Sequence, residues 1–186
     1  MLCSRIRKKL EYALIVLVQE NHIDSIKIKD LVLIAHISTS TFYGNFENLD
    51  DFIEYTIDEI FAAFQQDCSI FKRIPNSTTC VFKLMADAFD KHRLILSSAY
   101  NSRYRSIIEK NIDAIFSDRL QFCIDSEYLL NESLEKIELF LSSGYKGLIS
   151  KYIDTADRSY LDSASDLLQK TIELYSSSKY AKKALN

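Results

Sequence analysis

The sequence predicts an all-α protein, and three observations lead to that prediction. The chain has 186 residues but only 3 Gly and 1 Pro, so there are few positions at which a helix has to stop. Apolar residues make up 47% of the chain, which is enough for a sizeable core. Along most of the sequence they recur at the three- and four-residue spacing of amphipathic helices. We expect about nine helices.

The first expected helix spans residues 4–20 and has one continuous apolar face. A short helix at 29–35 follows, and a turn at His36 and Ile37 separates it from another that opens at Ser38. Ser38 is a good N-cap, since its hydroxyl can accept a hydrogen bond from a backbone N–H of the first turn. This arrangement predicts two short helices around a tight turn.

Longer amphipathic stretches predict the remaining helices. The clearest interruption is the segment 73–77, where Pro75 stops one helix and Asn76 or Ser77 can cap the next. The expected spans are 48 or 49–71, 78–90, 92–100, 102–126, 133–153 and 160–176.

The helix that opens at Ser38 has a polar, uncharged outer surface. Phe42 and Phe46 are four residues apart and can both face inward. The outward positions carry hydrogen-bonding groups and no carboxylate, which would be repelled by phosphates. These positions are Thr39, Ser40, Thr41, Tyr43 and Asn45. The pattern favours a helix that enters a groove of DNA.

The segment 26–52, IKIKDLVLIAHISTSTFYGNFENLDDF, resembles the helix-turn-helix of the TetR/AcrR family of one-component bacterial transcription regulators. The matching positions are Leu31, Ala35, Ile37, Ser38, Thr41, Phe42, Tyr43, Phe46 and Phe52. Two positions depart from the family pattern. His36 stands where the family usually has Gly, so a positive φ would strain the backbone modestly there. Leu49 stands where the family usually has a phosphate-contacting Lys.

The resemblance implies a DNA-binding domain at 1–47 and a helical effector-binding and dimerisation domain at 48–186. It also implies a dimer that binds a palindromic operator in double-stranded DNA, because two heads about 34 Å apart reach successive major grooves. A small-molecule effector would release the operator, and the family's usual mode is repression. Thr41 and Ser40 are expected near base edges of the DNA. Contacts with the phosphate backbone of the DNA are expected at Lys27, Lys29, Ser38, Thr39, Tyr43, Asn45 and Asn48.

The last two expected helices each have a wide apolar face, which favours a partner copy over burial within the monomer alone. Gly144 and Gly147 lie in mid-helix, where close approach of two backbones would explain them. The expected dimer interface comprises Ile137, Phe140, Leu141, Gly144, Leu148, Tyr152, Leu161, Ala164, Leu168, Thr171 and Tyr175. The family resemblance also implies an effector site in the helical body. The candidate residues there are the aromatic side chains Phe61, Phe64, Phe82, Phe89, Tyr100, Tyr104, Phe116, Phe122 and Tyr145, although any single one of them is more often ordinary core.

Charge, cysteine and histidine usage set further limits. The formal net charge is −3, but residues through Phe46 hold six basic and four acidic side chains, which leaves −5 for the remainder. The four Cys and three His residues are scattered, so we expect no metal, no other cofactor and no catalytic residue. No run approaches the roughly 18 apolar residues of a membrane span, and the N-terminus does not resemble a signal peptide. We expect a cytoplasmic protein.

Two other classes of protein remain open. One is a helical dimeric adaptor that binds proteins and whose DNA-binding head has degenerated, which His36 and Leu49 favour. The other is a helical enzyme, against which stands the lack of paired carboxylates, ligand clusters or an activated nucleophile.

Overall fold

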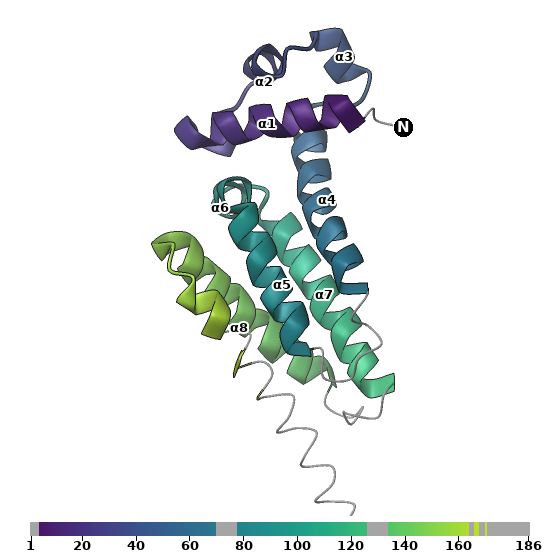
Figure 1. Ribbon diagram of the computed structural model, residues 1–186, viewed down its shortest axis with the longest axis vertical. Coiled ribbons are helices and arrows are strands. Elements are labelled where there is room, and N and C mark those ends of the chain that lie inside the picture. Colours follow the sequence, from purple (N-terminus) through teal and green to yellow (C-terminus); the bar gives the residue numbers. More distant parts are fainter. Residues whose placement is uncertain (1–3, 70–77, 126–133, 164–165, 168–169, 171–186) are drawn as a thin grey trace, which may run out of the picture. The chain divides into compact units, whose positions relative to one another are not determined.

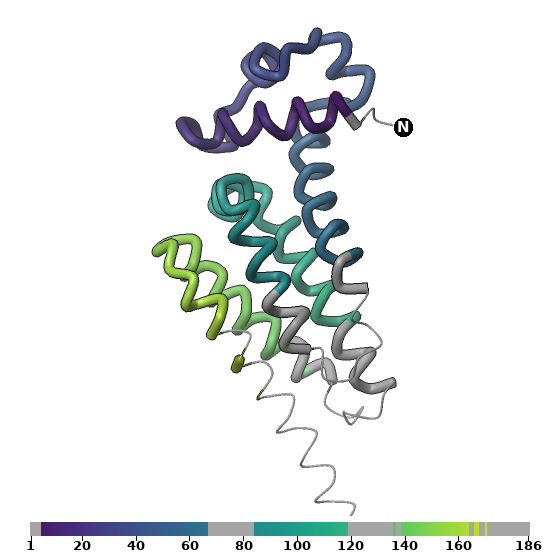
Figure 2. Tube along the Cα trace, in the orientation of Figure 1, coloured from purple at the N-terminus to yellow at the C-terminus, as the bar shows by residue number. Residues whose placement is uncertain are grey.

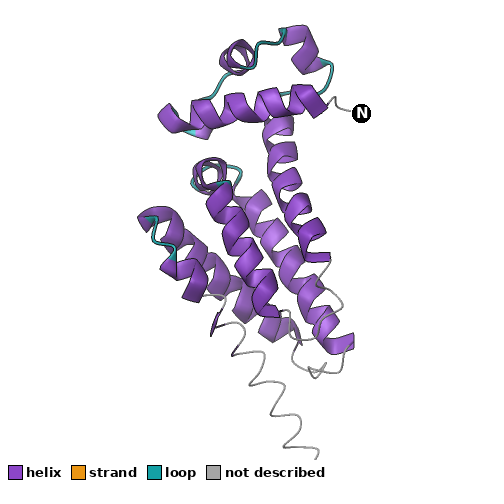
Figure 3. Cartoon of the chain, in the orientation of Figure 1, coloured by secondary structure: helices purple, strands orange, loops and turns teal. Residues whose placement is uncertain are grey.

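A computed structural model describes residues 4–69, 78–125, 134–163, 166–167 and 170 of the chain. Figure 3 shows that the secondary structure in these ranges is helical. It comprises eight α-helices and one 3-10 helix, and a further helical stretch begins at Ser159. The all-α prediction with about nine helices is therefore confirmed.

The chain divides into two compact units, which do not follow the order of the sequence. The head unit consists of residues 1–61 and 92–108, and the bundle unit consists of residues 62–91 and 109–186. The expected division by function into residues 1–47 and 48–186 stays a prediction. In terms of packing, the first half of the fourth helix and the segment 92–108 belong with the head.

The head unit is built around the N-terminal helix, against which the helix-turn-helix and a later helix pack (Figure 1). Its apolar side chains are fully buried at positions such as Leu10, Leu14, Leu31 and Phe52. The elements are α1 (Ser4–Glu20), η1 (Ile23–Ser25), α2 (Ile28–Ile34), α3 (Thr39–Tyr43), the first part of α4 (Leu49–Ser69), and α6 (Arg93–Tyr100).

The bundle unit contains α5 (Thr78–Lys91), most of α7 (Arg105–Asp125) and α8 (Leu134–Thr155), whose course is traced in Figure 2. Side chains of α8 reach both of the other helices. The Lys146 ammonium lies 2.8 Å from a carboxylate oxygen of Asp113 on α7. The Tyr152 hydroxyl donates to Asp90 on α5 at 2.7 Å. Polar contacts therefore join helix α8 to both α5 and α7.

The observed helices begin and end close to the expected positions, with two differences. The 3-10 helix η1 was not expected. Helix α7 begins at Arg105 and not at Ser102, because Ser102 is in a turn where its hydroxyl donates to the Ala99 carbonyl at 2.7 Å and accepts from the Tyr104 N–H at 3.1 Å. The expected break at 73–77 and most of the expected last helix lie outside the described residues.

Within the described ranges, none of the helices has the length and apolar character that crossing a membrane would require.

Candidate nucleic-acid interface

Helix α2 lies with one side in the core of the head unit and the other in solvent. Leu31 and Val32 are buried, and Lys29 and Leu33 are exposed. Lys27 occupies the N-cap position in an extended conformation, and its side chain makes no capping hydrogen bond. Both lysines predicted to contact DNA, Lys27 and Lys29, are therefore exposed at the start of α2. Phosphate contact by these two residues stays a prediction.

The turn between α2 and α3 is a Schellman motif with histidine in the left-handed position. The N–H of Ile37 donates to the Val32 carbonyl at 3.1 Å, and the N–H of His36 donates to the Leu33 carbonyl at 3.2 Å. His36 has φ 50°, the positive value that its place in the motif requires. The turn forms with His36 in place of the Gly that the TetR/AcrR pattern has at this position, because the two hydrogen bonds hold the strained His36 backbone in place.

Helix α3 begins with a side-chain cap. The Ser38 hydroxyl accepts from the Thr41 N–H at 3.0 Å, and the two hydroxyl oxygens lie 2.7 Å apart. The amide of Asn45 donates to the Thr41 carbonyl at 2.7 Å and covers the other end of the helix. Ser38, Thr41 and Asn45 thus hold the helix together. Of the predicted DNA-contacting residues in α3, Thr39, Ser40 and Tyr43 are exposed and Thr41 is half-buried.

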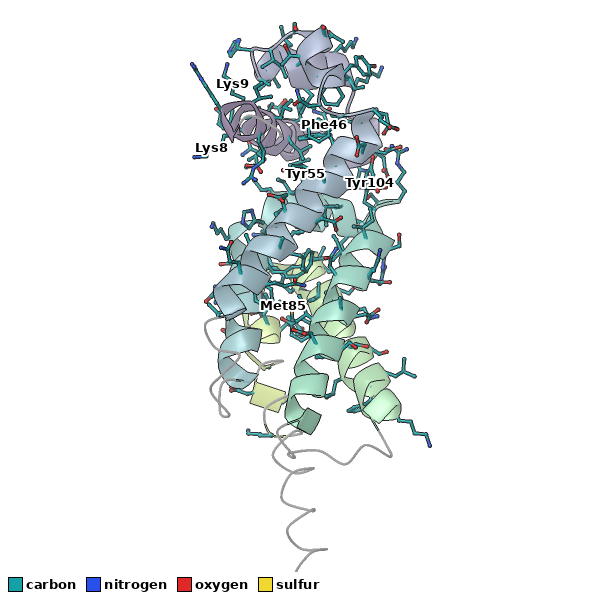
Figure 4. The ribbon with its side chains drawn as sticks, turned by 90° about the vertical axis from the view of Figure 1, so that its right-hand side faces the viewer. Lys8, Lys9, Phe46, Tyr55, Met85 and Tyr104 are labelled. Atoms are coloured by element: carbon teal, nitrogen blue, oxygen red, sulfur yellow. The ribbon has the colours of Figure 1, made fainter. Side chains whose placement is uncertain are left out.

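Aromatic side chains support α3 from the inner side. Phe42 is fully buried, and its ring centroid lies 5.6 Å from that of Phe46 and 6.1 Å from that of Phe52. Phe46 also packs against Tyr55, 5.5 Å away, and both residues are labelled in Figure 4. On the outer side, Tyr43 keeps 55% of its surface exposed while its ring meets the edge of Phe42. The aromatic cluster therefore fixes α3 and presents Tyr43 outward.

The N-terminus of α4 is capped by acidic and amide side chains. The Asn48 amide oxygen accepts from the Asp51 N–H at 2.9 Å, and the Asp51 carboxylate accepts from the Glu47 N–H at 2.9 Å. Asp50 adds a second carboxylate in the first turn. These groups already use the amide oxygen of Asn48 and oppose an approaching phosphate. Asn48 is a weaker candidate for DNA contact than its sequence position indicates.

Helix α1 carries basic side chains in its first turns. Lys8 is exposed and Lys9 is half-buried, and Figure 4 shows both extending away from α1. Arg7 is engaged elsewhere, since its guanidinium pairs with Glu11 on α1 and with Glu59 on α4. A hydrogen bond with Tyr55 raises the pKa of Arg7, more than burial lowers it. The charge of Arg7 thus serves the packing of α1 on α4.

The predicted effector-binding residues do not form a single group. Tyr100 and Tyr104 are buried within the head unit, where each hydroxyl meets an arginine. Phe61 is also assigned to the head unit. In the bundle unit, Phe116 and Tyr145 pack edge to face with centroids 5.4 Å apart. Phe64 and Phe89 are buried in the same unit, and the side chains of Phe82 and Phe122 lie outside the described part of the structure.

The predicted dimer residues also separate into two sets. Leu141, Tyr152 and Leu161 are buried within the chain itself, so these three belong to the core and have almost no surface to offer another subunit. Phe140 is 70% exposed, Gly144 is exposed, and Leu148 is half-buried. The side chains of Ile137, Ala164, Leu168, Thr171 and Tyr175 lie outside the described residues.

Sequence reasoning missed one exposed apolar residue on α8. Leu139 is 67% exposed beside Phe140. Gly144 and Gly147 continue the same side of the helix, and a Cβ added at either would meet nothing within 4 Å. This α8 surface, formed by Leu139, Phe140, Ser143, Gly144 and Gly147, is apolar at one end and nearly free of side chains at the other.

Among the described residues, no three His, Cys, Asp or Glu side chains gather in a way that could hold a metal ion.

Comparison with known proteins gives a fold but no family. No family model matches the sequence, and no curated protein sequence matches it either. Among solved structures, the chain is similar to the dihydroxyacetone kinase operon activator DhaS, with a TM-score of 0.73 and 15% sequence identity. The match covers 91% of this chain and 97% of that one. At this identity the likeness shows that the two share an all-helical fold, and the similar protein is named as an operon activator.

Proposed function

We propose that this protein is a one-component transcription regulator of the TetR/AcrR type, which binds a palindromic operator as a homodimer. The observation that carries the proposal is the outer surface of α3. Thr39, Ser40 and Tyr43 are exposed there on a capped helix without a carboxylate, and buried phenylalanines hold that helix from below. Such a surface suits the donors and acceptors that line the major groove of DNA.

Within this proposal, Ser40 lies nearest the base edges, and Thr39 and Tyr43 contact the phosphate backbone. Thr41 contributes less to base contact than Ser40, because its hydroxyl is within hydrogen-bonding distance of Ser38. Lys27 and Lys29 supply positive charge at the start of α2, since both are exposed there. The acidic start of α4 lowers the overall affinity for DNA and makes these two lysines more important.

A second copy would cover the α8 surface. Two exposed large apolar side chains, Leu139 and Phe140, stand next to two glycines that let another helix approach closely. Dimerisation removes this apolar surface from water and sets two recognition helices side by side. The resemblance to the family and the position of α8 in the chain support the same role.

A small-molecule effector is the second partner in the proposal. Phe64, Phe89, Phe116 and Tyr145 are each buried in the bundle unit, and we place the ligand in the apolar interior to which they contribute. Burial raises the pKa of the Tyr145 hydroxyl, so this group stays neutral and can hydrogen-bond a polar atom of a ligand. Stabilisation against heat across a panel of metabolites would identify the effector.

Repression is the mode that the family resemblance implies, and it is the first candidate. Activation is the second, because the similar solved structure is that of an operon activator. A fusion of the neighbouring promoter to a reporter gene separates the two modes. Deleting the regulator raises expression from a repressed promoter and lowers it from an activated one. Either mode places the protein in the cytoplasm, where the operator is.

Electrophoretic mobility shift with the DNA that flanks the protein's own gene tests the central claim. We expect binding that weakens steeply as salt rises, because phosphate contacts release counterions. Tyr43→Ala should abolish the shift. The matched control is Tyr12→Ala, since Tyr12 is exposed to a similar extent, 63% against 55% for Tyr43, but lies on α1. Unchanged binding by the Tyr43 variant would show that α3 is not the recognition helix, and no binding by the native protein would favour an adaptor.

A further inference from the structure

We propose that Arg103 positions the helix-turn-helix for DNA by tying the α6–α7 turn to both ends of the segment that contains α2 and α3. The proposal rests on the function proposed above. It concerns the Arg103 cluster, which consists of Asp24 in η1, Asp50 in α4, and Arg103 with Tyr104 between α6 and α7. All four residues belong to the head unit.

One arginine reaches two aspartates that are far apart in the sequence. The Arg103 guanidinium lies 2.5 Å from a carboxylate oxygen of Asp50 and 3.7 Å from a carboxylate oxygen of Asp24. The short contact to Asp50 is a charge-assisted hydrogen bond. Because a guanidinium is planar and carries several N–H donors, it can serve both carboxylates at once, which an ammonium does less well.

Tyr104 completes the cluster from the buried side. Its hydroxyl donates to the same carboxylate oxygen of Asp50, and it accepts from the Arg103 guanidinium at 2.9 Å. The Arg103 guanidinium also lies 5.1 Å from the Tyr104 ring centroid, where a cation is attracted to the aromatic face. Only 2% of Tyr104 is exposed, so its hydroxyl has a fixed position. The buried tyrosine therefore gives a set geometry to an ion pair that would otherwise be weak at the surface.

The charge states suit these contacts. Burial and the hydrogen bond to Asp50 raise the pKa of Tyr104 to about 12, so the phenol keeps its proton at neutral pH. The same hydrogen bond and the nearby Arg103 hold the pKa of Asp50 below its ordinary value, so its carboxylate is charged. A neutral donor and a cation thus face an anion, and every group in the cluster has a complementary partner.

Two more hydrogen bonds join the same region to η1. The Ile23 N–H donates to the Ser98 hydroxyl of α6 at 3.1 Å. The His22 ring nitrogen Nε2 lies 3.1 Å from the Asn101 carbonyl oxygen. Segment 98–104 therefore contacts the chain just before α2 as well as the start of α4.

These contacts lie on either side of the DNA-binding segment and outside it. Asp24 comes four residues before α2 begins, and Asp50 comes seven residues after α3 ends. A movement of the α6–α7 turn would therefore pull on both flanks of the helix-turn-helix while leaving its internal caps intact. Arg103 acts through Asp24 and Asp50, so it is a positioning residue that need not touch DNA.

Arg103→Gln and Tyr104→Phe test the proposal, with amide hydrogen exchange measured on the full chain without DNA. We expect roughly fivefold faster exchange at Ile23 and through α2 and α3, the effect of losing one exposed ion pair of ordinary strength. Exchange in α8 should stay the same. Operator affinity should fall by a similar factor. Arg103→Lys should have a smaller effect on both exchange and affinity, because lysine keeps the positive charge but lacks the planar set of N–H donors.

Arg158→Gln is the matched control. Arg158 also pairs with more than one aspartate, namely Asp87, Asp90 and Asp162, but it lies in the bundle unit. The substitution removes the same positive charge as Arg103→Gln. This variant should leave exchange in α2 and α3, and operator affinity, as in the native protein. An equal loss of affinity in the Arg158 variant would mean that net charge explains the Arg103 result, and it would overturn the proposal.

The possible outcomes separate this inference from the proposed function. Unchanged exchange of α2 and α3 in both Arg103→Gln and Tyr104→Phe overturns the positioning role, whatever happens with DNA. Faster exchange with unchanged operator affinity also overturns it, because the cluster would then be structural only. If the native protein binds no operator, the proposed function fails, and the exchange measurement still decides whether the Arg103 cluster holds the helix-turn-helix.

Discussion

The hydroxyl groups of Ser38 and Thr41 lie 2.7 Å apart at the first turn of α3, and the Ser38 oxygen also accepts the Thr41 N–H. One serine therefore satisfies a backbone donor that the helix itself leaves without an acceptor. Because α3 has only five residues, it has few hydrogen bonds of its own, and this cap forms a large share of what holds it.

Ser38→Ala should lower the free energy of unfolding by about 1 kcal/mol, the usual cost of losing an N-cap. Urea unfolding followed by circular dichroism measures the change. Ser40→Ala is the control, since it removes the same hydroxyl from an exposed position that caps nothing, and its effect should stay within about 0.5 kcal/mol. Equal losses in both variants would contradict the role of the Ser38 cap.

His36→Gly should stabilise the protein by about 1 kcal/mol. His36 has φ 50°, a conformation that is strained for a residue with a Cβ and free of strain for glycine. The side chain is exposed, so little packing is lost. Thermal unfolding measures the gain. His36→Val should destabilise the protein, because a β-branched residue tolerates positive φ least. A Gly variant no more stable than the Val variant would contradict the claim that the backbone is strained at His36.

The contribution of Asp50 to the free energy of unfolding should be lost at acid pH. A hydrogen bond from Tyr104, together with Arg103, lowers the folded-state pKa of Asp50 below its unfolded value of about 3.9. The contribution is therefore present above about pH 4 and is lost as the pH falls through the lowered folded-state pKa. Urea unfolding of native protein and Asp50→Asn at pH 7 and at decreasing pH should show a difference that shrinks toward acid. A constant difference would contradict the ionic interaction.

The local parts of this fold could be predicted from the sequence, because their causes are local. Ser38 marks the start of α3 through its hydroxyl, and the spacing of Phe42 and Phe46 shows which side of that helix is buried. The positive φ of His36 followed from its place in the turn. Each of these features depends on residues within about one helical turn, where side-chain chemistry and backbone geometry are directly linked.

The long-range parts could not be predicted, because periodicity does not say which apolar face finds a partner. Residues of α8 are apolar on more than one side, so Leu141 in the core and Leu139 in solvent look alike in the sequence. Tyr104 was expected among effector-binding aromatics, yet it contacts Asp50, 54 residues earlier. Only the three-dimensional fold brings the α6–α7 turn next to the start of α4.

The α8 surface leads to the last prediction, which concerns the oligomeric state. Leu139→Glu with Phe140→Glu should convert a dimer into a monomer, because burying two carboxylates from each subunit without partners is strongly unfavourable. Sedimentation or light scattering at micromolar concentration measures the mass. The control is Leu33→Glu, since Leu33 is 72% exposed and lies on α2, far along the chain from α8. This control should remain dimeric.

A double variant that is still dimeric would mean that the second copy binds elsewhere. A native protein that is monomeric at high concentration would remove the basis for a palindromic operator, since a single head reads one half-site only.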